Sequence, residues 1–123
     1  MDRKTAKEFL HLRDWLGKAQ ELIGAGRDAY TNDQFRQEAG DSLMMKLGEA
    51  ANRLLRAGVV APEGVVWADA IANRNWLIHQ YDEIDRDITW ATLAQDLPAW
   101  REALGDTFVA AEKYLEDEAD DHH

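Results

Sequence analysis

The stretch that decides the fold of this 123-residue chain runs from residue 65 to residue 81 and reads VVWADAIANRNWLIHQY. Residues 65–80 predict a helix with apolar residues on nearly every side. Such a helix is buried on several sides, either by its own bundle or by a partner subunit. Its last two turns nevertheless carry a cation, an amide, an imidazole and a phenol. Because buried polar groups destabilise a fold unless they are paired, this end of the helix is predicted to be a working surface.

Helical periodicity continues on both sides of this stretch. Apolar residues recur at three- and four-residue steps over long segments, and no convincing strand or internal repeat interrupts them. The predicted helices follow the apolar patterns of residues 9–23, 35–54, 65–80, 88–97 and 100–115. The sequence therefore predicts an all-α fold, an antiparallel bundle of four to five helices.

Local signals place the ends of these helices. Thr31-Asn32-Asp33 offers N-caps for the second helix, whose apolar stripe begins at Phe35. Pro62 is positioned to open the third helix, and Asp87 can cap the short fourth one. We expect one helical domain over residues 1–115.

Composition narrows the class of protein. Hydrophobic residues make up 46% of the chain, which contains five tryptophans and no cysteine. The tryptophans at positions 67, 76, 90 and 100 are expected in the core because they share the spacing of other apolar residues. No apolar run approaches the roughly 20 residues of a membrane span, and no signal region leads the chain. We expect a soluble, cytoplasmic protein with no membrane association.

The charge argues against general nucleic-acid binding. The formal net charge is −10, whereas nucleic-acid binders usually present a basic face. From residue 112 to residue 123, six acids stand against one lysine, so a net −5 belongs to this end of the chain. Residues 116–123 are predicted to form an acidic, flexible tail. RNA binding by this chain would therefore need a local cationic spot.

The polar residues of the third helix fall on two lines. At about 100° per residue, Arg74 and Tyr81 lie almost on one line, and Asn75 and His79 on another. Arg74 and His79 are then about 140° apart. Two routes would bring them to one phosphate: unwinding near Gln80, or pairing with a second copy across a two-fold axis. The apolar character of the helix favours the homodimer.

These residue types suit phosphodiester chemistry. The imidazole of His79 can accept or donate a proton near neutral pH, and the guanidinium of Arg74 can hold a phosphate. Asn75 can orient His79 or the ribose, and Tyr81 can donate to a phosphate oxygen. No metal and no cofactor is predicted, because the sequence offers no good carboxylate–His ligand set.

A structural interpretation of the same residues stays open. His79 would then be a satisfied core or interface histidine, and Arg74 an ion-pair partner of Glu49 or Asp82. Glu49 and Arg53 are also candidates for the rim of an RNA-binding cleft, although a helix-packing or solvated role is the alternative for each.

The wider pattern resembles a known family. In order, the chain contains LGEAANRL at 47–54, Trp67-x3-Ile71, Arg74-Asn75-x3-His79-x-Tyr81-x2-Ile84-Asp85, Trp90 and Asp96-Leu97-Pro98. This order resembles the HepT-like branch of the HEPN superfamily. The resemblance implies an all-α bundle that dimerises with the motif in a cleft between subunits. Many members are metal-independent ribonuclease toxins, and the antitoxin is a minimal nucleotidyltransferase called MntA that adds AMP to the motif tyrosine.

The resemblance implies a role for each motif residue. Arg74 and His79 would be catalytic, Asn75 would support them, and Tyr81 would be the position that receives AMP. The expected function is a toxin endoribonuclease with an RNA substrate and an MntA-type partner. A non-catalytic, nucleotide- or substrate-binding subunit of a two-component nucleotidyltransferase is the main alternative, and a plain structural bundle is the third.

Overall fold

The computed structural model describes residues 1–80 and 82–121, so Tyr81 and the pair 122–123 lie outside the described residues. The described part is all-α and contains no strand, which confirms the predicted fold class. Its elements are α1 (Arg3–Ile23), α2 (Arg27–Thr31), α3 (Gln34–Arg56), α4 (Trp67–His79), α5 (Arg86–Ala91), the π-helix η1 (Thr92–Asp96), α6 (Leu97–Ala103) and α7 (Gly105–Asp120).

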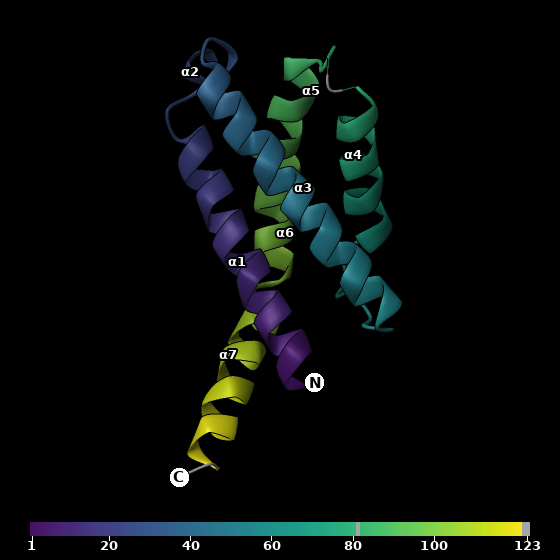
Figure 1. The fold of residues 1–123 in the computed structure, drawn as a ribbon. Coiled ribbons are helices and arrows are strands. Elements are labelled where there is room, and N and C mark those ends of the chain that lie inside the picture. Colours follow the sequence, from purple (N-terminus) through teal and green to yellow (C-terminus); the bar gives the residue numbers. More distant parts are fainter. Residues whose placement is uncertain (81, 122–123) are drawn as a thin grey trace.

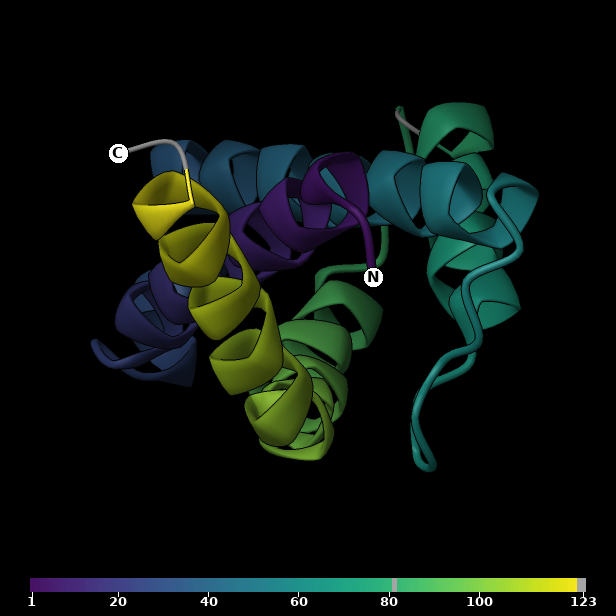
Figure 2. The ribbon, with the colours of Figure 1, turned by 90° about the horizontal axis from the view of Figure 1, so that it is seen from below.

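The long helices alternate in direction along the chain. α1 and α4 run one way, whereas α3 and the succession of helices from α5 to α7 run the other way (Figure 1). α1 packs against α3 and α7, and α3 forms its most extensive contact with α4. Figure 2 shows α4 at one end of α3, on the side away from α7. No helix in the described part of the chain has the length and apolarity needed to cross a membrane.

One apolar core joins α1, α3 and α6. Trp67 and Trp100 are buried and meet edge to face with ring centroids 5.9 Å apart, as expected for core tryptophans. Trp76 and Trp90 are only half-buried and pack against the edge of this core. The prediction of four core tryptophans is therefore confirmed for two of them.

The start of α3 follows the prediction in its cap and departs from it in its packing. The carboxylate of Asp33 accepts the backbone N–H of Phe35 at 2.9 Å, which confirms the predicted N-cap. The Phe35 side chain, however, is 83% exposed, so its place in the apolar stripe was wrong. Tyr30 is buried at this end of the bundle. It belongs to α2, a short helix that lies between the predicted helices of residues 9–23 and 35–54.

Two other helix starts differ from the prediction. α4 begins at Trp67 with Val66 in the N-cap position, and Pro62 lies in the preceding loop. α5 is capped by Asp85, whose carboxylate accepts the backbone N–H of Asp87 at 2.9 Å. Asp87 was the predicted cap, and the true one lies two residues earlier because a side chain caps the N–H groups that follow it.

α4 is less buried than its apolar sequence predicts. Only Trp67 and Leu77 are buried within one copy of the chain, whereas Val66 is 52% exposed and Ile78 is 42% exposed. The reason is that α4 has one main neighbour, α3. Burial on several sides by the chain's own bundle is therefore wrong, and burial by a partner subunit stays a prediction.

The acidic end of the chain is helical as far as it is described. α7 continues to Asp120, and Arg3 of α1 pairs with Glu118 at 3.4 Å. The division into a domain of residues 1–115 and a flexible tail of residues 116–123 stays a prediction.

Candidate functional site

Arg74 lies where α3 and α4 approach each other closely, opposite Gly48. A Cβ atom built on Gly48 would be only 2.5 Å from the Cβ of Arg74 and 2.8 Å from the carbonyl oxygen of Ala70. Real Cβ atoms do not approach other atoms this closely, so no larger residue fits at position 48 unless α4 moves. Gly48 therefore sets the position of the Arg74 side chain. Its signal in the sequence is a glycine inside a helical pattern, and the partner it packs against is visible only in the structure.

The Arg74 guanidinium is only partly satisfied. Its Nε lies 3.7 Å from Glu49 Oε1, so one of the two predicted ion pairs is confirmed as a contact. This distance is too long for a hydrogen bond, and the buried Nε has no hydrogen-bond partner among the described residues. One Nη donates to Asn75 Oδ1 at 3.3 Å. An orphaned buried N–H on a cation favours an anionic acceptor at this point.

A cleft of about 470 Å³ opens beside Arg74. Its charged lining groups are three guanidinium groups and one carboxylate, and two asparagine amides add neutral donors. The lining residues are Gly48, Glu49, Asn52, Arg53, Arg56, Ile71, Arg74 and Asn75. We call this hollow the arginine cleft. It is a local cationic spot of the kind that RNA binding by a chain of net charge −10 would need.

Arg53 is held at the edge of the arginine cleft by Glu8 of α1. Its Nε and one Nη donate to Glu8 Oε1 at 3.0 and 2.6 Å, and this hydrogen bonding raises the pKa of Arg53. The Glu8 side chain is 13% exposed, while that of Arg53 is 48% exposed. The sequence does not reveal the role of Glu8, because Glu8 lies 45 residues from Arg53 and no local pattern links the two.

The predicted residues divide into those in the cleft and those outside it. Glu49, Arg53, Arg74 and Asn75 all line the arginine cleft. His79 is exposed and is the last residue of α4, and it does not line this cleft. α4 stays helical through His79, so the separation of about 140° from Arg74 holds within one copy. The predicted regulatory position, Tyr81, lies outside the described residues.

Comparison with known protein families identifies the family of this chain. A family profile described as ribonuclease HepT-like matches residues 12–106, which include every residue of the arginine cleft and His79. The chain belongs to the ribonuclease HepT-like family. The resemblance drawn from the sequence is thereby confirmed. Glu8, which anchors Arg53, lies just before the matched region of this HepT-like chain. Comparisons with curated proteins and with solved structures gave no match.

Proposed function

We propose that this HepT-like chain is an endoribonuclease that cleaves RNA without a metal at a site built from Arg74 and His79, as the toxin of a toxin–antitoxin pair. The supporting observation is the Arg74 guanidinium, one of three that line the arginine cleft, whose buried Nε–H is unpaired within the part of the chain that the structure describes. Such a group binds a phosphate oxygen with a charge-assisted hydrogen bond. Family membership supplies the substrate class, RNA.

The reaction follows from these residue types. The ribose 2′-hydroxyl attacks the adjacent phosphorus while His79 accepts its proton, and the bond to the 5′-oxygen breaks. A protonated histidine returns a proton to the leaving 5′-oxygen, so the products are a 2′,3′-cyclic phosphate and a 5′-hydroxyl. Arg74 offsets the charge that builds on the equatorial oxygens, and Asn75 orients the guanidinium.

A second copy of the chain completes the site in this proposal. The exposed Ile78 and Val66 and the half-buried Ile71 and Trp76 leave α4 with apolar surface that a partner α4 can cover. In a two-fold arrangement the same patch meets itself, so His79 of one copy can approach Arg74 of the other. The separation of about 140° on one helix then ceases to be an obstacle.

Regulation is proposed at Tyr81. An MntA-type nucleotidyltransferase would transfer AMP from ATP to the phenol oxygen and release pyrophosphate. The added phosphate brings negative charge two residues from His79, where an RNA phosphate must bind. The modified chain would bind RNA weakly and cut it slowly.

The direct test is cleavage of a fluorogenic RNA by the purified chain and four variants. Arg74→Ala and His79→Ala are each expected to lower the rate by about 10²–10³-fold. The matched controls are Arg36→Ala on α3 and the exposed His11→Ala on α1, which lie outside the arginine cleft and should keep wild-type rates. Equal rates for His79→Ala and His11→Ala would refute the catalytic role of His79.

Mixing the two inactive variants tests whether the site is shared between copies. A mixed dimer has one site with both an intact Arg74 and an intact His79, provided that the two come from different copies. Random exchange should therefore restore roughly a quarter of the wild-type rate. If each site uses both residues of one copy, the mixture stays inactive.

A non-catalytic subunit that presents a nucleotide or another substrate to a nucleotidyltransferase is the second candidate. Two observations favour it. His79 lies outside the arginine cleft, and the cleft arginines Arg74 and Arg53 already face the carboxylates of Glu49 and Glu8. Expression in a bacterial host without the partner separates the two functions. The toxin arrests growth unless Arg74 or His79 is replaced, whereas the binding subunit leaves growth unchanged.

A further inference from the structure

The arginine cleft extends beyond Arg74 along one face of α3. Four of its lining residues are spaced by three or four positions and therefore share that face. They are Glu49, Asn52, Arg53 and Arg56. Along the helix axis, Arg53 lies about 7.5 Å and Arg56 about 12 Å beyond Gly48, the residue opposite Arg74. The three arginines therefore follow one another along α3 in the order Arg74, Arg53, Arg56, and we call them the arginine row.

Arg56 ends the arginine row and is not used by the fold. It is exposed in the last turn of α3. Within the described residues, no ion pair involves Arg56, whereas the other two arginines of the row each face a glutamate. A guanidinium that borders a hollow without a carboxylate partner is available to an anion from outside the chain.

Arg53, in the middle of the row, keeps a terminal nitrogen for a further acceptor. Its Nε and one Nη donate to Glu8 Oε1, and no hydrogen bond involves the other Nη within the described residues. A guanidinium has five N–H donors in a fixed fork, so Glu8 occupies one edge and orients the rest. Because the Arg53 side chain is half exposed, a phosphate oxygen can reach the remaining donors.

A second hollow continues from the arginine row toward the start of α1. It encloses about 340 Å³ and shares Arg53 and Arg56 with the arginine cleft. Its other lining residues are Asp2, Lys4, Thr5, Glu8, Leu54 and Ala57. Both of its carboxylates are used by the fold, because Asp2 caps α1 and Glu8 holds Arg53. The two hollows therefore adjoin at two arginines, and we call the second one the α1 hollow.

A row of cations beside two adjoining hollows fits an extended polyanion. We propose that Arg53 and Arg56 hold the two phosphates next to the scissile phosphate, so that the substrate is a single strand of RNA bound through three successive phosphates. This inference rests on the proposed placement of the scissile phosphate at Arg74. A positively charged groove that follows the backbone is a general way to bind a single strand. The strand leaves through the α1 hollow, and a mononucleotide occupies only one position of the row.

The test is the binding of fluorescent 2′-O-methyl oligouridylates to the full wild-type chain. Their methylated 2′-oxygen cannot attack the phosphorus, so binding is measured without cleavage. Fluorescence anisotropy at low salt should show an affinity that rises with each nucleotide up to three phosphates and then levels off. Uridine 5′-monophosphate should compete about tenfold more weakly than the oligonucleotide with three phosphates. Equal competition by the monophosphate would overturn the proposal, and so would the absence of oligonucleotide binding up to millimolar concentrations.

Variants then locate the contacts. Arg56→Gln should weaken binding of the three-phosphate oligonucleotide about fivefold at low salt. It should also reduce the slope of log affinity against log salt by about 0.7, the share of one phosphate on a single strand. Arg53→Gln should reduce the slope by the same amount. The matched control is Arg36→Gln, on α3 outside both hollows, and an equal loss of slope there would assign the effect to overall charge and refute the row.

Cleavage measured beside binding separates this inference from the ribonuclease function. If the chain binds the oligonucleotides with these slopes and cuts no unmethylated RNA, the three phosphate contacts are upheld and the proposed ribonuclease function fails. If the chain cuts RNA and Arg56→Gln keeps the wild-type affinity and salt slope, the ribonuclease function is upheld and the phosphate contacts fail.

Discussion

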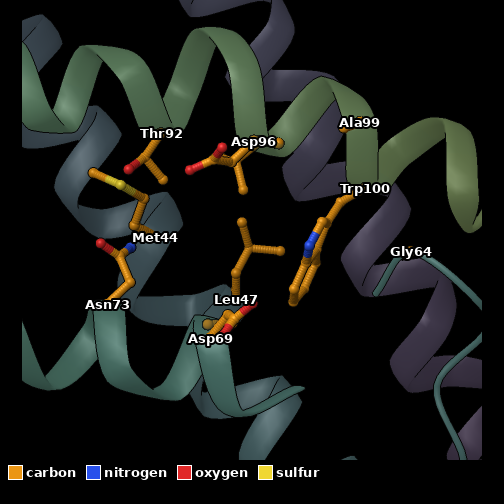
Figure 3. Close-up of a pocket in the computed structure, with 11 residues that line it drawn as sticks. Met44, Leu47, Gly64, Asp69, Asn73, Thr92, Asp96, Ala99 and Trp100 are labelled. Carbon is orange, nitrogen blue, oxygen red and sulfur yellow. The ribbon is translucent and has the colours of Figure 1, made fainter. Parts of the chain in front are cut away.

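α4 separates two hollows of opposite charge. On the flank toward α3, Arg74 and Asn75 face a cleft with three guanidinium groups and one carboxylate. On the flank toward η1, Asp69 and Asn73 line a hollow of about 420 Å³ that we call the acidic cavity, because the charged groups among its described lining residues are the carboxylates of Asp69 and Asp96 (Figure 3). The arginine cleft depends on the close approach of α3 and α4 at Gly48. The acidic cavity depends on the π-helix η1 before Pro98, in which the Leu97 N–H donates to the Thr92 carbonyl. A net charge of −10 therefore predicts neither surface, because each is set by the local backbone.

Replacement of Gly48 by alanine should have the largest effect. The new methyl group would overlap the Ala70 carbonyl and the Arg74 stem, so α4 must shift or the helices must strain. We expect a loss of about 1–3 kcal/mol in the free energy of unfolding. A displacement of Arg74 by about 1 Å would also lower RNA cleavage by about 10²-fold. Urea unfolding followed by circular dichroism measures the first effect, and the fluorogenic RNA assay measures the second.

Gly105→Ala is the matched control for this substitution. A Cβ at position 105 would meet no atom within 4 Å, so the change should be neutral or stabilising by up to about 1 kcal/mol. If Gly48→Ala unfolds at the same urea concentration as Gly105→Ala, close packing does not hold the arginine cleft together.

A buried hydrogen bond anchors α5, the helix that leads into η1 and the wall of the acidic cavity. The hydroxyls of Tyr30 and Thr89 lie 2.5 Å apart, and both side chains are fully buried. Thr89→Val keeps the shape but leaves the tyrosine hydroxyl without its partner, which should cost about 1–3 kcal/mol of unfolding free energy. Thermal and urea unfolding measure this loss. RNA cleavage at a permissive temperature should persist, in contrast to Gly48→Ala.

A double-mutant cycle sharpens this prediction. Tyr30→Phe removes the other hydroxyl, so adding it to Thr89→Val should cost less than the two separate losses together. Strict additivity would show that the two hydroxyls do not interact and that α5 is held by packing alone.

The sequence predicts features that depend on the apolar periodicity of a single helix. It does not predict features that depend on contacts between helices. The apolar spacing along α1, α3, α4 and α7 predicts all four long helices and the all-α class. Periodicity does not reveal that Tyr30 is buried and Phe35 exposed, because the hydrogen-bond partner of Tyr30 is Thr89, 59 residues away.

The candidate site follows the same rule. Arg74 and Asn75 are visible as polar residues in an apolar helix, and the structure places both in one cleft. The Glu8 that anchors Arg53 and the close approach at Gly48 need the tertiary contacts of α1, α3 and α4. In the proposed dimer, Arg74 and His79 of one site come from different copies, and a single chain does not reveal that arrangement.

A smaller effect is expected from Glu49→Gln. This change removes the carboxylate that faces Arg74 and leaves an amide of similar shape. Binding of a 2′-O-methyl RNA, which cannot be cleaved by attack of the 2′-oxygen, should tighten by up to about fivefold at low salt. The gain should shrink as salt screens the charges. Fluorescence anisotropy at low and high ionic strength measures it. Glu38→Gln, an exposed change of the same charge on α3, is the control, and an equal gain there would assign the effect to overall charge.

The smallest effect should come from the cap of α1, the helix that carries Glu8. The Asp2 carboxylate accepts the Thr5 N–H at 2.8 Å, and this bond lowers the pKa of Asp2 below its ordinary value of 3.8. The ionised cap therefore favours the folded state above that value, and the benefit is lost as the pH falls through the lowered pKa. Asparagine caps helices about as well and does not titrate. Asp2→Asn should thus match the wild-type melting temperature and RNA cleavage at pH 7, and lose less melting temperature than the wild type at pH 3. A lower melting temperature for Asp2→Asn at pH 7 would contradict this account, because the charge itself would then hold α1 in place behind Arg53.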